Sequence, residues 1–169
     1  MDFVSQAEYA ATIYPDATNS IRIITAQRKN GDYEVLLAFH RFGTDQSRPV
    51  DNISSGGLCA LINVETGVIG TAMTKIEPGK AVPVHPDTQS QIEGGAVPNW
   101  GELKRKLLQV HRCFPYYVFF AWDIVIDENG EPTALEINRG SDLGIQMIQP
   151  QRHEKLGAFM REYGLLEKW

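Results

Sequence analysis

The chain has 169 residues, a length typical of one globular domain. Its 16 Lys and Arg residues against 21 Asp and Glu residues give a net charge of −5, so nucleic acid is not an expected partner. Hydrophobic residues make up 43% of the sequence, which is enough for a sizeable core, and no apolar run is long enough to span a membrane. The first ten residues lack the basic and apolar parts of an export signal, so we expect a cytoplasmic protein without a membrane partner.

Two cysteines, Cys59 and Cys113, lie far apart in the sequence. Their spacing predicts neither a disulfide framework nor a zinc site, and it agrees with a reducing compartment. We expect both side chains to be buried as small apolar groups.

The first predicted hairpin joins a strand over Ile21–Gln27 to a strand over Tyr33–His40, with Asn30 and Gly31 as a two-residue turn. This register places Arg22 opposite Phe39 and Ser20 opposite Arg41. Arg22 and Arg41 then become diagonal neighbours on one face of the sheet. The same face carries four apolar residues: Ile24, Ala26, Val35 and Leu37.

Two arginines at one end of an apolar face indicate an anion site. The planar guanidinium donates parallel hydrogen bonds to phosphate or carboxylate. The alternative is that Arg22 and Arg41 each form an ion pair with a nearby Asp or Glu.

The segment VDNISSGG at residues 50–57 combines short polar side chains with two glycines. Gly56 and Gly57 allow a ligand to approach the backbone closely, and Asn52, Ser54 and Ser55 offer polar groups beside them. A simple turn is the commoner explanation of such a segment. A second hairpin is predicted after it, with strands over residues 58–64 and 68–75.

Residues 77–98 are polar and rich in Gly and Pro, which predicts a long loop of the kind that often carries function. The apolar spacing after it predicts a helix over residues 99–111 with Asn99 as its N-cap, and a last helix over residues 153–163. Three hairpins with few helices predict an α+β fold, in which helices pack on one face of an antiparallel sheet.

The third hairpin joins residues 117–126 to residues 133–138 through Asn129 and Gly130. It places Asp123 opposite Glu136 and Ala121 opposite Asn138, so that Asp123, Glu136 and Asn138 share one face. The other face is predicted to be the core face and carries Trp122, Ile124, Ile126, Leu135 and Ile137.

Two opposed carboxylates repel each other, and a hard cation offsets that repulsion. Carboxylate and amide oxygens are the ligands that Mg²⁺ prefers, so Asp123, Glu136 and Asn138 are candidate Mg²⁺ ligands. The alternative is that these polar side chains form the solvated face of the hairpin.

Taken in order along the chain, these segments resemble the C-terminal part of an ATP-grasp domain, and most closely the sugar-transfer-associated ATP-grasp family. The matching segments are NSIRI at 19–23, FHRFG at 39–43, VDNISSGG at 50–57, HPDT at 85–88, VPNW at 97–100, AWDIVI at 121–126 and LEIN at 135–138. Each of them is a weak signal, but the ordered set is specific.

The resemblance implies ATP-dependent activation of a carboxylate through an acyl phosphate, followed by attack of an amine. The cofactors would be ATP and Mg²⁺, and the substrates would be a small carboxylate and an amine. Asp123, Glu136 and Asn138 would bind Mg²⁺, and Arg22 and Arg41 would be catalytic through contacts with phosphate or the acyl phosphate. The implied set also includes Asn52, Ser55, Gly56 and Gly57 beside the phosphates, and His85 and Asp87 on the substrate side.

Two departures accompany the resemblance. Ala121 stands where many ATP-grasp ligases, such as D-alanine:D-alanine ligases, carry Arg, so Arg22 or Arg41 would supply that cation. The resemblance also covers only the second lobe of a two-lobed clamp, so we expect a homodimer or a separate N-terminal lobe.

Two other function classes remain open. One is a non-catalytic binding or interaction module derived from an ATP-grasp lobe. The other is a Mg²⁺-dependent phosphoester hydrolase, which is disfavoured because none of the four histidines, His40, His85, His111 and His153, has the spacing of a metal ligand or a base.

Overall fold

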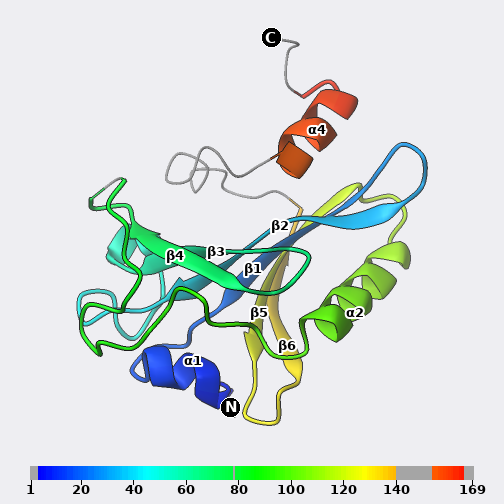
Figure 1. The fold of residues 1–169 in the computed structure, drawn as a ribbon. Helices are drawn as coiled ribbons and strands as arrows, with labels where there is room; N and C mark the ends of the chain where they lie inside the picture. Colours follow the sequence, from blue (N-terminus) through cyan, green and yellow to red (C-terminus); the bar gives the residue numbers. More distant parts are fainter. Residues whose placement is uncertain (1–3, 78, 140–153, 166–169) are drawn as a thin grey trace.

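The computed structural model describes residues 4–77, 79–139 and 154–165. Its centre is a six-stranded antiparallel sheet in the order β4-β3-β2-β1-β5-β6 (Figure 1). This arrangement confirms the predicted α+β class. The elements are α1 (Glu8–Ile13), β1 (Ile21–Gln27), β2 (Tyr33–Phe42), the 3₁₀ helix η1 (Ile53–Ser55), β3 (Leu58–Ile62), β4 (Ile69–Thr74), α2 (Trp100–Arg112), β5 (Phe119–Ile126), β6 (Pro132–Asn138) and α4 (Glu154–Glu162).

The helices lie on both faces of the sheet. We expected them on one face, and α1 and α2 lie there, packed against the larger hydrophobic cluster. The last helix, α4, packs on the other face, where Leu156 and Phe159 are buried with Ile24, Phe39 and Ala121. The two faces are called the α2 face and the α4 face below.

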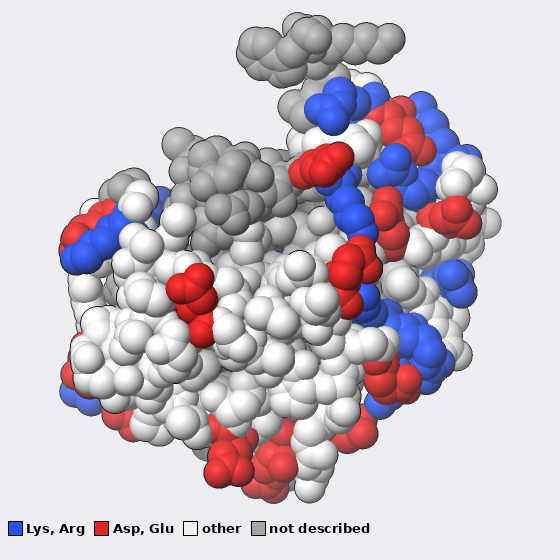
Figure 2. Space-filling model, in the orientation of Figure 1, with Lys and Arg blue, Asp and Glu red and all other residues white. Residues whose placement is uncertain are grey.

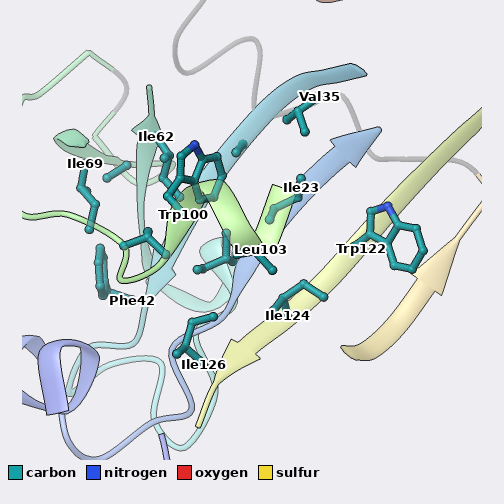
Figure 3. Packing of buried hydrophobic residues seen from close by; sticks show 14 of the residues in the cluster. Ile23, Val35, Phe42, Ile62, Ile69, Trp100, Leu103, Trp122, Ile124 and Ile126 are labelled. Carbon is teal, nitrogen blue, oxygen red and sulfur yellow. The ribbon is translucent and has the colours of Figure 1, made fainter. Parts of the chain in front are cut away.

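The α2 face holds the main core of the protein (Figure 3). Trp100, Leu103 and Leu107 recur at helical spacing along one side of α2 and are buried against the sheet. Trp122 and Ile124 of β5 belong to the same cluster. Burial of this large apolar area is the main stabilising contribution to the fold.

The first and third hairpins have the same turn, and it differs from the predicted two-residue turn. Arg28 pairs with Asp32 across a loop whose third residue, Gly31, has φ +90°. Asp127 pairs with Glu131 in the same way, with Gly130 at φ +81°. A two-residue type I′ turn requires positive φ at both residues, whereas a three-residue loop requires it only at the glycine that ends it.

A β-bulge in each hairpin restores the predicted register at the far end of the strands. The bulges lie at Ile24/Thr25 and at Asp123/Ile124. Beyond them Arg22 faces Phe39, Asp123 faces Glu136 and Ala121 faces Asn138, and these pairings confirm the predictions.

Nearer the turns the prediction of side-chain direction is wrong. Val35 is buried on the α2 face instead of lying beside Leu37, because the bulge shifts the alternation of β2 by one residue.

Leu135 and Ile137 are exposed at 51% and 47%, although both were predicted to be core residues. They lie on the edge strand β6, whereas α2 and α4 pack over the central strands β1 and β2.

The long loop after β4 is attached to that strand. Ala72 and Val82 exchange backbone hydrogen bonds, and so do Ile69 and the Gly94–Gly95 pair. These bonds cover the edge of β4, which would otherwise be open to pairing with another chain. Asn99 stands at the N-cap position of α2 as predicted, with φ +50° and without a side-chain capping bond.

Within the described residues the last helix spans Glu154–Glu162, inside the predicted range 153–163, and His153 lies outside the described residues. Cys59 is buried as predicted, but Cys113 is exposed, which corrects the prediction for that residue. Burial raises the pKa of the Cys59 thiol.

The charges are unevenly distributed over the surface seen in Figure 2. Charged side chains gather over α2 and the β1–β2 hairpin and are sparser over the loop that follows β4. Within the described part of the chain, no helix combines the length and the apolar character needed to cross a membrane.

Candidate functional site

A cluster of charged side chains lies on the α4 face, beside the apolar area that α4 covers. It consists of Arg22 on β1, Arg41 on β2, Asp123 on β5, and Ser20 and Asp51 in the segments before β1 and β3, and we call it the charged cluster. Strand alternation places Arg22 and Asp123 on the face that also carries Ile24 and Ala121.

Arg22 and Asp123 form the centre of the charged cluster. They are direct partners across β1 and β5, a pairing that the hairpins alone did not predict. Arg22 Nε donates to Asp123 Oδ1 at 2.7 Å, and Nη2 donates to Oδ2 at 2.6 Å. The side chains are only 15% and 8% exposed, and hydrogen bonding to Asp123 raises the pKa of Arg22. Arg22 therefore supplies the charge that offsets the repulsion between Asp123 and Glu136.

Arg41 is held by Ser20 and lies next to the same carboxylate. Its Nε and Nη2 donate to Ser20 Oγ at 2.9 and 2.5 Å, and Nη2 lies 3.5 Å from Asp123 Oδ2. Arg22 and Arg41 therefore lie close together. Each of them also contacts a carboxylate, which agrees with the alternative that each arginine forms an ion pair.

Asp51 and Ser20 complete the cluster, and neither was predicted to be a site residue. The backbone N–H and the hydroxyl of Ser20 donate to Asp51 Oδ2 at 2.7 and 2.5 Å. Asp51 Oδ2 also lies 3.5 Å from Arg41 Nε, and Asp51 is only 9% exposed. The available signal was a carboxylate inside VDNISSGG, but its partners are distant in the sequence and only the fold reveals them.

Glu136 and Asn138 lie beside the charged cluster on β6. Glu136 is exposed opposite Asp123, and its charge also raises the pKa of Arg22. Asn138 is half-buried opposite Ala121. The three expected Mg²⁺ ligands thus occupy neighbouring positions on two paired strands.

The donor set fits a hard cation, because two carboxylates and an amide offer only oxygen ligands. Each carboxylate oxygen of Asp123 has a second lone pair beyond the one that Arg22 uses. Among the described residues, no group of three or more His, Cys, Asp and Glu side chains is placed to hold a metal ion. A metal bound here would therefore depend on Asn138 or on groups of a ligand.

The loop before β3 forms a closed turn joined to the charged cluster through Asp51. Asn52 Oδ1 accepts from the Ser54 N–H at 3.0 Å, and Ser55 N donates to the Asn52 carbonyl. Gly56 has φ +108°, and a Cβ on Gly57 would lie 2.6 Å from the Asp51 carbonyl oxygen. The turn itself therefore requires these two glycines, and it places them next to Asp51.

His85 and Asp87 contact the segment that follows β2, and Asp87 also lines one pocket together with Gly56. His85 is fully buried, its Nε2 donates to the Gly43 carbonyl at 2.7 Å, and its ring stacks on Tyr14. Asp87 Oδ2 accepts from the Asp45 N–H at 2.9 Å. These contacts attach the long loop to residues 43–45.

The other described histidines also serve in structural hydrogen bonds. His40 donates through Nδ1 to the Arg41 carbonyl and accepts at Nε2 from Tyr9. His111 donates through Nε2 to the Tyr117 carbonyl and accepts at Nδ1 from Thr25. None of these contacts places an imidazole base beside the charged cluster.

A comparison with known protein families finds a match over most of the chain. The sequence profile of the family described as sugar-transfer associated ATP-grasp matches residues 2–156. Searches of curated proteins and of solved structures find no match. The family match includes all six strands and the start of α4, and ATP-grasp proteins generally bind ATP with Mg²⁺. The chain therefore belongs to the sugar-transfer associated ATP-grasp family.

Proposed function

We propose that this chain is the phosphate-binding lobe of an ATP-dependent carboxylate-amine ligase. The carboxylate oxygen would bond to the γ-phosphorus as ADP leaves, and the amine nitrogen would then bond to the acyl carbon as phosphate leaves. The observation that carries the proposal is the pair of nearly buried arginines around Asp123, with Glu136 and Asn138 beside them.

Each part of the charged cluster has a role in this reaction. Arg22 and Arg41 would donate to phosphate oxygens and neutralise charge that develops during transfer. An arginine has more N–H donors than the two that Arg22 uses on Asp123, so donors remain for a ligand. Ser20 and Asp51 would keep Arg41 pointed at the ligand.

Asp123, Glu136 and Asn138 would hold Mg²⁺, which supplies charge neutralisation and orientation of the phosphates when bound. The turn that contains Asn52, Ser55, Gly56 and Gly57 would lie beside the phosphates, because Asp51 joins it to the cluster. His85 and Asp87 are left out of the proposed site, since their contacts are with Gly43 and Asp45.

A non-catalytic binding module is the second candidate, and one observation favours it. Both oxygens of Asp123 already accept hydrogen bonds from Arg22, so the pair is satisfied without a metal. In that case the cluster would bind an anion through Arg41 and would not need Mg²⁺.

Calorimetric titration with a non-hydrolysable ATP analogue separates the two candidates. We expect the chain to bind the analogue only with Mg²⁺, and Glu136→Gln to weaken binding by about tenfold or more, which corresponds to the loss of one charged ligand. Glu128→Gln, in the exposed turn of the same hairpin, is the matched control and should bind as the wild type does.

Binding of the analogue without Mg²⁺, or equal binding in Glu136→Gln, would contradict the metal site and favour the binding module. Absence of any binding would contradict both the phosphate-binding lobe and its metal site. Unfolding curves of both variants check that each remains folded.

A further inference from the structure

An apolar pocket lies between α4 and the first residues of β5. Its volume is about 380 Å³, which is within the range of pockets that bind small molecules. The described lining residues are Val118, Phe119, Arg139, Leu156, Phe159, Met160, Tyr163 and Leu165. The pocket is not predictable from the sequence, because only the packing of α4 on the sheet forms it.

The walls of the pocket are aromatic and fixed by their own contacts. The rings of Phe119 and Phe159 lie 6.1 Å apart, and those of Phe159 and Tyr163 lie 4.8 Å apart. The Tyr163 hydroxyl donates to the Gln27 carbonyl at 2.9 Å, which holds that ring in place. Preformed aromatic walls favour an apolar ligand, and especially one that contains an aromatic ring.

Arg139 gives the pocket its charge preference, since it is the one charged residue among the described lining residues. Its guanidinium lies 5.9 Å from the centre of the Tyr117 ring. An arginine among the lining residues of an apolar pocket is complementary to a ligand that combines an apolar body with a carboxylate.

The pocket and the charged cluster lie on the same face of β5. Phe119, Ala121 and Asp123 share that face, and the four residue steps from Phe119 to Asp123 span about 13 Å. Asn138 is the strand partner of Ala121, and Arg139 follows it directly. Arg139 therefore stands where the apolar pocket meets the proposed Mg²⁺ ligands.

We propose that this pocket binds the apolar tail of a carboxylic acid, with Arg139 holding the carboxylate. The inference rests on the proposed function in one respect, namely that this acid is the carboxylate to be activated. Binding of the acid itself requires neither nucleotide nor metal, so it is tested separately.

The test is titration with 4-phenylbutyrate and with its neutral analogue 4-phenylbutan-1-ol, without nucleotide or Mg²⁺. We expect saturable binding of the acid, and Arg139→Gln to weaken it by about threefold or more, as loss of a partly exposed ion pair does. Binding of the alcohol should not change in this variant. Arg161→Gln, an exposed arginine on α4 outside the pocket lining, is the matched control and should bind both probes as the wild type does.

A second variant tests the position of the site without changing Arg139. Leu165 lines the pocket and is 64% exposed, so Leu165→Glu should fold. Through charge repulsion it should weaken binding of the acid more than binding of the alcohol. The proposal would be overturned if the acid shows no saturable binding. It would also be overturned if Arg139→Gln and Leu165→Glu bind the acid as tightly as the wild type does. Binding of 4-phenylbutyrate by a chain that fails to bind the Mg²⁺-nucleotide would support the acid site but overturn its role in ligation.

Discussion

The two faces of the sheet bury polar groups in different ways. On the α2 face these groups are neutral and hydrogen-bonded in series: the Trp122 indole donates to Thr25, which bonds to His111, which bonds to the Tyr117 carbonyl. On the α4 face the nearly buried groups are full charges, because Arg22 and Asp123 lie next to Arg41.

This difference separates stability from function. Neutral hydrogen-bonded groups inside an apolar cluster add to stability and leave little for a ligand to do. Buried ion pairs contribute little net stability, because desolvation cancels much of their attraction. The proposed function assigns to ligand binding the charges that stability does not require, and each prediction below tests one side of this comparison.

The largest effect is expected on the α2 face. Trp122→Ala removes a side chain that is 2% exposed and ends its hydrogen bond to Thr25, so unfolding free energy should fall by about 3–5 kcal/mol. Urea denaturation measures this change. Val110→Ala on the exposed side of α2 is the control and should change stability by less than about 0.5 kcal/mol, and a similar loss in both variants would contradict the assignment of the core.

The second prediction concerns the charged cluster. Arg22→Leu should destabilise the protein by about 3 kcal/mol, because Asp123 is then a nearly buried carboxylate with one cation, Arg41, at 3.5 Å. The double variant Arg22→Leu/Asp123→Leu should be more stable than this single variant, since no buried charge remains unpaired. Additive losses in the same denaturation assay would instead mean that the ion pair is needed for stability.

The sequence predicted more of this site than of its surroundings. Strand alternation and Asn-Gly turns were enough to place Asp123 opposite Glu136 and Arg22 opposite Phe39. Both register predictions succeeded although the turns were wrong, because each bulge offset the extra turn residue.

The remainder depends on tertiary contacts that local patterns do not carry. Pairing of β1 with β5 brings Arg22 to Asp123, and Asp51 reaches Ser20 across 31 positions of the chain. The exposure of Leu135 and Ile137 follows from the place of β6 at the edge, which no pattern within the hairpin reveals.

A pH prediction tests the neutral groups of the α2 face. Burial lowers the pKa of His40 from 6.5 to about 4. As the pH falls, His40 therefore becomes protonated in the unfolded chain at a higher pH than in the folded chain. Stability should therefore decrease below about pH 6.5, by about 2 kcal/mol between pH 7 and pH 5 from this group. Denaturation of wild type and His40→Gln at both pH values measures the difference, and an equal pH dependence in the two proteins would contradict it.

The smallest effect is expected at the surface of α4. Lys155 Nζ lies 2.6 Å from Glu65 Oε1, and this ion pair lowers the pKa of Glu65, but both side chains are exposed. Solvent and salt screen such a pair, so Lys155→Gln should cost about 0.5 kcal/mol or less, and 1 M NaCl should remove the difference from wild type. A loss well above that value, unchanged by salt, would mean that Glu65 and Lys155 fix α4 on the sheet. The α4 face would then depend on a charge pair for its stability. That result would contradict the proposed difference between the two faces.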